Sequence, residues 1–312
     1  MPAPAKICVV GSSNIDLISR VPRLPRLGET MVGHSFHLGY GGKGANQAVM
    51  AAKLGARVTM VTKLGKDVFG EGTLANYRAQ GVDTAFVLFD EAEASGVAPI
   101  FVDDAARNFI VIVPGANNAL SPADARAAAD VIRAADVLVC QLEIPLVTTL
   151  EAFRIAHAAR VRTILNPAPA APLPDELLQL TDICVPNETE TELLTGLPVQ
   201  SLSQVESAAR KLLARGVRVV IVTLGERGAL VVEPDAVEQV APIEIDAVDP
   251  TGSGDAFIGS LAVFLGEGLS LRDAVRRANA IAARSVTQIG TQTSFPNRAE
   301  ADAFCAQRGV VT

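Results

Sequence analysis

The sequence has little positive charge and no long apolar run, and each absence argues against a class of protein. Its 312 residues include 27 Lys or Arg and 34 Asp or Glu, which gives a formal net charge of −7. A nucleic-acid-binding protein needs a basic surface to meet phosphates, so this balance argues against one. The apolar stretch after Lys6 ends at Gly11, too short for a signal peptide or a membrane span, and no other stretch qualifies.

Aromatic residues and paired cysteines are also scarce. The chain has no Trp, two Tyr, and four cysteines without CxxC spacing, namely Cys8, Cys140, Cys184 and Cys305. The first three lie in apolar runs, which favours reduced core residues and a cytoplasmic location. With 49% apolar and 20% charged residues, the composition is that of a soluble globular protein rich in Ala, Val and Leu.

Short apolar runs alternate with amphipathic segments along most of the chain. The runs expected to be buried parallel strands are KICVVG, RVTMVT, DVLVCQLE, RTILNPAP, DICVPN and VRVVIVTLG. The segments with helical periodicity are ANQAVMAAKLGA, SPADARAAADVIRAA, PLVTTLEAFRIAHAA and LSQVESAARKLLARG. This alternation predicts one α/β domain over residues 1–312, with a doubly wound, mainly parallel sheet whose ligands bind beyond the carboxyl ends of the strands.

Two regions break the alternation and read instead as short strands and turns. They are residues 15–40 and about 96–115, where VAPIFVD and NFIVIVP flank a turn in a hairpin pattern. Paired together, they would form a small sheet projecting from the body. Such a sheet suits a lid over a site or an oligomer contact, and the alternative is a surface hairpin without function.

The stretch GYGGKGANQA, residues 39–48, formally contains G-x-G-x-x-G, but neither common nucleotide motif fits. A Rossmann site wants an acidic residue at the end of the next strand, where Lys63 stands. A Walker A loop wants Ser or Thr after its lysine, but Gly44 follows Lys43. What remains is a flexible turn with Lys43 and Asn46 at a helix start, suited to a neutral ligand rich in hydroxyl groups.

Polar residues follow several of the expected strands, and each has two interpretations. Asn14 and Asp16 point the same way after the first strand, as a pair for sugar hydroxyls or as ordinary turn formers. Glu143 ends DVLVCQLE, where a charged residue is more often simply exposed.

Two later stretches, VPNETETELL and VTLGERGALVV, also allow two interpretations each. In VPNETETELL, Asn187 could cap a helix, while Glu188 and Glu190 either favour the helix dipole or hold a hydrated Mg²⁺. VTLGERGALVV contains either a plain turn or a bare backbone surface, from Gly225 to Gly228, on which a nucleotide lies flat.

The stretch DPTGSGDAFIGSL, residues 249–261, runs two glycines into an apolar helix-forming segment. The free N–H groups and the dipole of a helix start attract anions, so the loop suits negative charge. Asp255 is itself an anion at that point. It either caps the helix or is a chemically active carboxylate beside an anion site, and this stretch alone leaves both interpretations open.

Taken together, these motifs resemble the ribokinase family of carbohydrate kinases along essentially the whole chain. GGKGANQA and the D-x-T-G-x-G-D loop are similar to the two family signatures, and together they are highly specific. Further matches are the Asn14 and Asp16 pair, LEIP at Glu143, NPAPA at 166–170 and NETE at 187–190.

The resemblance implies phosphorylation of D-ribose at O5 by ATP, with a role for each matching residue. Asp255 would be the base, and Gly252, Ser253 and Gly254 would offer N–H groups to the transferring phosphoryl. The sugar would be held by Asn14, Asp16, Gly42, Lys43, Asn46 and Glu143, together with Asp255. The nucleotide would be lined by Asn187, Thr223, Gly225, Gly228, Gly254 and Asn279.

The resemblance also implies metal ions and a homodimer. Glu190 would lie near a hydrated Mg²⁺. A K⁺ ion would be enclosed by Asp249, Thr251, Ser285, Gln288, Gly290 and Ser294, mostly through backbone oxygens. The small sheet would form the dimer contact, as it does in the family.

Three positions depart from the family pattern. Pro250 and Ser253 replace residues that are more often Thr and Ala, and Asn279 stands where some members carry a histidine against the adenine. The alternatives are a relative acting on deoxyribose, fructose or a nucleoside, and a non-catalytic sugar-binding protein. The intact Asp255 and anion loop disfavour the last.

Overall fold

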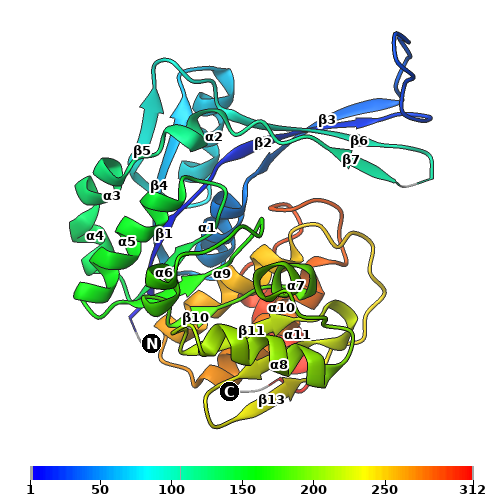
Figure 1. The fold of residues 1–312 in the computed structure, drawn as a ribbon. Helices are drawn as coiled ribbons and strands as arrows, with labels where there is room; N and C mark the ends of the chain where they lie inside the picture. The colour runs from blue at the N-terminus through cyan, green and yellow to red at the C-terminus, as the bar shows by residue number, and fades with distance from the viewer. Residues whose placement is uncertain (1–2, 106, 311–312) are drawn as a thin grey trace.

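The computed structural model describes residues 3–105 and 107–310, which form two sheets with helices on both faces of the larger one (Figure 1). The large sheet has nine strands in the order β13-β12-β11-β10-β9-β8-β1-β4-β5. Its strands are β1 (Lys6–Val10), β4 (Arg57–Gly65), β5 (Asp83–Asp90), β8 (Val137–Cys140), β9 (Arg162–Leu165), β10 (Ile183–Cys184), β11 (Val219–Thr223), β12 (Ala229–Val232) and β13 (Val237–Val240). All pair in parallel except β11 with β12 and β12 with β13, so the predicted doubly wound, mainly parallel sheet is confirmed.

The small sheet has four strands in the order β3-β2-β6-β7 and projects beyond the body (Figure 1). Its strands are β2 (Asn14–Arg20), β3 (Ser35–Gly41), β6 (Gly96–Val102) and β7 (Asn108–Ile110). They come from the two regions that lacked helical periodicity. Because β2 leaves the end of β1 after three residues, the small sheet starts at the carboxyl edge of the large one.

Helices and strands alternate over much of the chain, as predicted, but β11, β12 and β13 follow one another without a long helix between them, and so do the last three helices without a strand. The helices are α1 (Lys43–Lys53), α2 (Val68–Ala79), α3 (Pro122–Ala127), α4 (Ala129–Arg133), α5 (Leu146–Ala158), α6 (Asp175–Gln179), α7 (Glu188–Thr195), α8 (Leu202–Leu213), α9 (Ser253–Gly266), α10 (Leu271–Ser285) and α11 (Arg298–Gln307). Two short 3₁₀ turns cover Gly115–Ala119 and Gly225–Arg227. One expected helix, SPADARAAADVIRAA, is two, because Ala128 at φ −90° and ψ 9° interrupts it.

Two hydrophobic clusters fill the two faces of the large sheet. On β1, Ile7 and Val9 belong to one cluster while Cys8 and Val10 belong to the other, because successive side chains of a strand point to opposite faces. One cluster includes side chains of α1, α9 and α10, and the other includes those of α3, α5, α6 and α8. The continuous apolar runs in the sequence follow from this burial on both sides.

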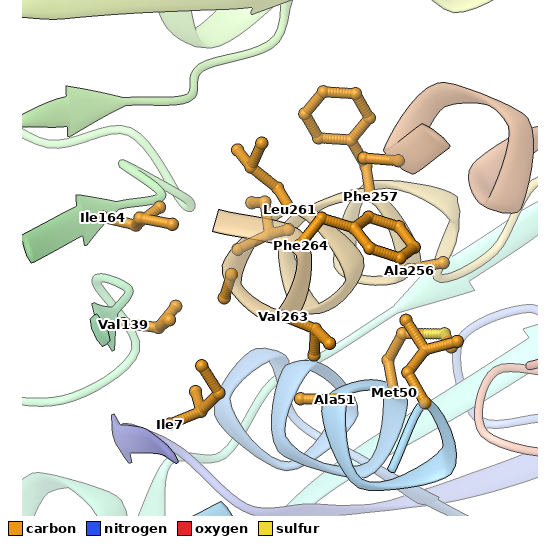
Figure 2. Packing of buried hydrophobic residues seen from close by; sticks show 14 of the residues in the cluster. Ile7, Met50, Ala51, Val139, Ile164, Ala256, Phe257, Leu261, Val263 and Phe264 are labelled. Atoms are coloured by element: carbon orange, nitrogen blue, oxygen red, sulfur yellow. The ribbon is translucent and has the colours of Figure 1, made fainter. Parts of the chain in front are cut away.

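The packing of α1 on α9 is close, which matters for the site (Figure 2). Met50 and Ala51 of α1 face Val263 and its neighbours on α9 in the first cluster. A Cβ atom on Gly259 of α9 would come within 2.7 Å of the backbone oxygen of Gln47 in α1. Glycine at this position therefore lets the two helices approach.

All four cysteines are free and buried, as expected for core residues. None of the helices in residues 3–105 and 107–310 combines the length and apolar character that a membrane span requires.

Candidate active site

Helix α9 begins with an unusual N-terminus that leaves backbone donors free. Its N-cap, Gly252, has a left-handed φ of 79° and no side-chain cap. A Cβ there would collide with Thr291, so the position needs glycine. The Ser253 N–H donates to the Pro250 carbonyl at 3.2 Å, whereas those of Gly254 and Asp255 have no partner among the described residues. The helix start is thus an anion site with two free N–H groups.

Asp255 does not cap this helix, so the capping interpretation is wrong. Its carboxylate is 8% exposed and turns toward α1, where Asn46 Nδ2 donates to Oδ2 and Gln47 Nε2 donates to Oδ1, both at 2.9 Å. Burial raises its pKa, while Lys43, Asn46 and Gln47 oppose the rise. A buried, oriented carboxylate beside an anion site is able to accept a proton from a ligand bound next to that site.

Three further charged residues gather around Asp255. Glu143 Oε2 accepts hydrogen bonds from the Ser12 hydroxyl at 2.6 Å and from the Lys43 backbone N–H at 2.9 Å, so it is not the simply exposed residue that its position alone would suggest. Burial, with the charges of Glu143 and Asp255, raises the pKa of Asp16 to about 7. Burial lowers the pKa of Lys43, but the carboxylates of Asp255, Glu143 and Glu190 outweigh it and raise that pKa overall.

Asn14 and Asp16 both belong to β2 and lie near the glycines that precede α1. Asn14 is buried, and its Oδ1 accepts from Asn117 Nδ2 at 2.8 Å, which leaves its own amide N–H groups available. A Cβ on Gly41 would overlap the Asp16 carboxylate. One on Gly42, which has a φ of 90°, would come within 2.7 Å of the Asn14 backbone nitrogen. These glycines allow β2 and the start of α1 to meet closely.

Among the residues expected to contact a nucleotide, Asn187 is the N-cap of α7 and forms a capping box with Glu190. The Glu190 carboxylate accepts from the Asn187 backbone at 2.9 Å and from its side chain at 3.0 Å. Burial raises the pKa of Glu190, and Asp255 adds to the rise, against the Asn187 hydrogen bond and Lys43. The capping interpretation of Asn187 is confirmed, whereas a magnesium ion at Glu190 stays a prediction.

The turn after β11 also lies here. Thr223 at the end of β11 bridges to Asn187, and its N–H donates to the Pro186 carbonyl at 3.0 Å. Gly225 and Gly228 have φ values of 54° and 82°, and a Cβ on Gly228 would collide with the Val240 carbonyl. These two glycines therefore have a backbone role whether or not a ligand lies on them.

One cavity of about 180 Å³ joins some of these groups, although Asn14, Asp16, Gly42, Asn46 and Glu143 do not line it. Its lining includes Lys43 and Asp255 from the sugar set and Asn187, Glu190, Thr223, Gly252 and Gly254 from the nucleotide and anion set. Asn279 lies elsewhere, in a second hollow of about 300 Å³ beside β13, where its Nδ2 donates to the Ala241 carbonyl at 3.0 Å.

The residues expected around a monovalent cation lie on two adjacent segments. Asp249 Oδ1 accepts from the Thr251 N–H at 3.0 Å, and Oδ2 accepts from the Gly290 N–H at 2.9 Å. Burial raises the pKa of Asp249, but these hydrogen bonds hold it below its usual value. Ser285 ends α10 and its carbonyl accepts from the Gln288 N–H, while the Ser294 hydroxyl donates to the Thr291 carbonyl.

Several polar residues of the site received no role from the sequence, although Gln47 and Asn166 lie in the motifs GGKGANQA and NPAPA. They are Ser12, Gln47, Asn117, Gln141, Asn166 and Gln292. The available signal was weak: Gln47 stands inside the apolar stretch of a helix, and Gln141 directly follows a buried strand. Both are fully buried, and a buried amide needs partners that the local sequence does not reveal.

Comparison with known proteins gives consistent matches over nearly the whole chain. Residues 4–298 match the family described as pfkB family carbohydrate kinase. The chain is 44% identical to a ribokinase of Mus musculus, over 94% of this chain and 92% of that one, and 42% identical to a deoxyribokinase of Salmonella typhi, over 93% and 95%. The structure of Arabidopsis thaliana ribokinase complexed with ribose and ATP matches with a TM-score of 0.90 at 34% identity, over 97% of this chain and 98% of that one.

Proposed function

The chain belongs to the pfkB family of carbohydrate kinases, and we propose that it transfers the γ-phosphoryl group of ATP to O5 of D-ribose. The observation that carries the proposal is the position of Asp255. Its oriented carboxylate and the free N–H groups of its own helix turn line one cavity with Lys43 and Asn187. The similar protein of Arabidopsis thaliana, solved with ribose and ATP, supports the choice of both substrates.

In this mechanism Asp255 accepts the proton of the ribose O5 hydroxyl as that oxygen attacks the γ-phosphorus. The new P–O bond forms while the bond to the β-phosphate oxygen breaks, and ADP leaves. Phosphoryl transfer depends mainly on positioning and on stabilising the charge of the transferring group. The free N–H groups of Gly254 and Asp255 would supply that stabilisation, together with the N–H of Gly252, which also has no partner among the described residues. The Ser253 N–H, which was expected to contribute, is instead bonded to the Pro250 carbonyl.

The sugar would lie between the small sheet and α1. Asp16, Glu143 and the free amide of Asn14 offer partners for its hydroxyl groups, with the backbone of Gly42 and the side chains of Lys43 and Asn46 at the start of α1. A pocket of this kind discriminates against a sugar lacking one hydroxyl, because its buried polar groups are then left unpaired.

The nucleotide would lie along the other wall of the cavity. Asn187, Thr223 and Gly254 line it, and the turn from Gly225 to Gly228 continues away from it. Asn279 would meet the adenine from the neighbouring hollow beside β13.

The residues present fit the metal ions that the family resemblance implies. No group of three or more His, Cys, Asp or Glu side chains in residues 3–105 and 107–310 is placed to hold a metal ion. Mg²⁺ binds readily through one carboxylate, its own waters and substrate phosphates, so Glu190 at the cavity wall suits it. Such an ion would neutralise charge on the phosphates.

Asp249 and the neighbouring carbonyl groups suit K⁺. Its carboxylate is already held by backbone N–H groups on both oxygens, which fixes it beside the 285–294 segment. Thr251, Ser285, Gln288, Gly290 and Ser294 would complete the set. The ion would order the loop that leads into α9 without contacting the sugar.

The small sheet would serve as lid and dimer contact. The residues from its strands β3 and β7 and the segment that follows them include several exposed apolar side chains: Phe36, Leu38, Phe109, Ile110, Val111, Ile112 and Val113. A cluster of exposed apolar residues of this size is characteristic of a protein interface. We place the homodimer there, and the enzyme in the cytoplasm because its cysteines are free.

The experiment that tests the function is ADP release with a panel of sugars at fixed ATP and Mg²⁺. We expect D-ribose to give the highest kcat/KM, with phosphorylation at O5 shown by ³¹P and ¹³C NMR of the product. The similarity to a deoxyribokinase makes 2-deoxyribose the second candidate substrate. A higher kcat/KM for 2-deoxyribose, fructose or a nucleoside would replace the proposed substrate and keep the kinase. No ADP release with any of them would contradict the kinase itself.

A further inference from the structure

Both oxygens of the Asp255 carboxylate are held by amides of consecutive residues on α1. Asn46 Nδ2 donates to Oδ2 and Gln47 Nε2 donates to Oδ1, each at 2.9 Å. The close approach of α1 and α9 at Gly259 places them there. Asn46 belongs to the proposed sugar site, but Gln47 is fully buried and does not line the cavity. Its contact with the base therefore serves something other than substrate binding.

The amide of Gln47 can face the carboxylate in one orientation. Its Nε2 also donates to Asn166 Oδ1 at 3.1 Å, and its Oε1 accepts from Gln141 Nε2 at 2.6 Å. Rotating the amide by 180° would set its oxygen against the carboxylate and its N–H groups against those of Gln141. Gln141 and Asn166 thus fix Gln47 as a donor to Asp255.

Gln141 is poorly explained by stability alone. Its Oε1 is buried without a hydrogen-bond partner among the described residues, which is unfavourable for an amide oxygen. A Cβ on Gly11 would overlap this oxygen, so a glycine on a neighbouring strand end makes room for it. An apolar side chain of the same length would remove this unpaired oxygen, but it would leave Gln47 Oε1 without its donor. The interaction that requires glutamine at this position is the hydrogen bond from Gln141 Nε2 to Gln47 Oε1.

We propose that Gln47 is a positioning residue for the base, aligned in turn by Gln141. It holds the Asp255 carboxylate in the rotamer that presents a lone pair to the sugar hydroxyl, and its N–H favours the ionised form. The inference rests on the proposed function, since it assigns a role in the deprotonation of the sugar.

Other charged groups also act on Asp255 and are kept unchanged in the test. They are Lys43 on α1, Asp16 on β2, Glu143 after β8 and Glu190 on α7. Any shift caused by a change at Gln47 must therefore be measured against wild type with this surrounding set intact.

The test is the Gln47→Met variant, which keeps the length of the side chain and removes its hydrogen bonds. We expect kcat to fall about tenfold, the effect of one hydrogen bond to a charged group, while KM for ribose and for ATP stays within about threefold. The acid limb of the pH profile, where kcat falls at low pH as Asp255 becomes protonated, should move to higher pH by up to about one unit when kcat is measured at saturating substrates. The reason is that the ionised carboxylate loses a hydrogen-bond donor, which raises its pKa. A role in packing alone would lower kcat without moving this limb.

Thr149→Val is the matched control. Thr149 is also fully buried and bonds to the backbone carbonyl of Gln141 at 3.4 Å, outside the amide chain. Its removal should leave the acid limb in place.

Gln141→Met gives a second test that does not depend on the stability of the first variant. Its unfolding temperature should lie close to that of wild type, because the change removes the unpaired Gln141 Oε1 but unpairs Gln47 Oε1, while kcat falls and the acid limb moves in the same direction by a smaller amount. The double variant should be no worse than Gln47→Met alone, because both changes remove one relay. An unmoved acid limb in both single variants, or fully additive losses, would overturn the inference while leaving the kinase activity of wild type as the separate test of function. A wild-type protein without kinase activity would overturn both.

Discussion

Asp16 provides a prediction in which stability and activity move in opposite directions. The side chain is partly buried, and burial with the charges of Glu143 and Asp255 raises its pKa from the ordinary 3.8 to about 7. Above pH 7 the protein without substrate therefore holds an ionised carboxylate in an environment that disfavours it. Asp16→Asn removes that charge and keeps the shape of the side chain. We expect the variant to be more stable than wild type at pH 8 and to bind ribose more weakly.

The sign follows from the direction of the shift. The folded pKa lies above the unfolded one, so the contribution of Asp16 to stability is fully present below the unfolded value and is lost as pH rises through about 7. The difference between 3.8 and about 7 corresponds to at most about 4 kcal/mol. Relaxation and water entry reduce this figure, so we expect a gain of about 1 to 4 kcal/mol for the variant at pH 8 and little difference at pH 4.

The measurement is thermal or urea unfolding of the two proteins without ligands at pH 4 and pH 8. Asp235→Asn, at an exposed position, controls for the loss of one negative charge. In parallel, KM for ribose should rise at least about tenfold in Asp16→Asn, because a charged hydrogen-bond acceptor is lost. If the variant were no more stable than wild type at pH 8, or if its advantage were the same at both pH values, the pKa argument would be refuted.

Four other outcomes are expected. Asp255→Asn should lower kcat by about 10²-fold or more, with the affinity for an ATP analogue, measured by calorimetry, close to that of wild type; near-normal turnover would rule out the base. K⁺ should activate more than Na⁺ at constant ionic strength, and Asp249→Asn should abolish the difference; equal rates in K⁺ and tetramethylammonium would contradict the cation site. Ribose should exceed 2-deoxyribose in kcat/KM by about one to two powers of ten, and Asn14→Met should narrow the gap by weakening ribose more. Ile110→Asp should convert a dimer to a monomer in light scattering, with no effect if the small sheet stays free in solution.

The core of the large sheet was predictable from the sequence because the same pattern, a short apolar run followed by an amphipathic segment, repeats along the chain. The central strands of the large sheet, such as β1 and β8, are apolar on both faces, since helices cover both, and Val9 and Val10 illustrate how neighbouring residues enter opposite clusters. The small sheet was recognisable by contrast, because its strands lack covering helices. The interruption at Ala128 was not predictable, since no Gly or Pro marks it.

The site was less predictable, because its hydrogen bonds join distant segments. Asp255 stands where local rules favour a helix cap, but its partners Asn46 and Gln47 are 209 and 208 residues away. The partner of Asn46, Gln292, is 246 residues away. A local pattern can identify polar residues at the ends of strands, as it did for Asn14, but it cannot show which of them meet.

The charges of the site give a physical reason for the cations that we propose. Negative charge on Glu143 and Asp255 raises the pKa of Asp16, the charge of Asp255 also raises the pKa of Glu190, and Lys43 is the cation whose pKa is raised by Glu143, Glu190 and Asp255. Bound ATP would add further negative charge to this group of acidic side chains. The start of α9 contributes the equivalent of about half a positive charge, which is too little to balance it. Positive charge must therefore arrive with the nucleotide or sit beside the loop, which is the physical reason for assigning Mg²⁺ to Glu190 and K⁺ to Asp249.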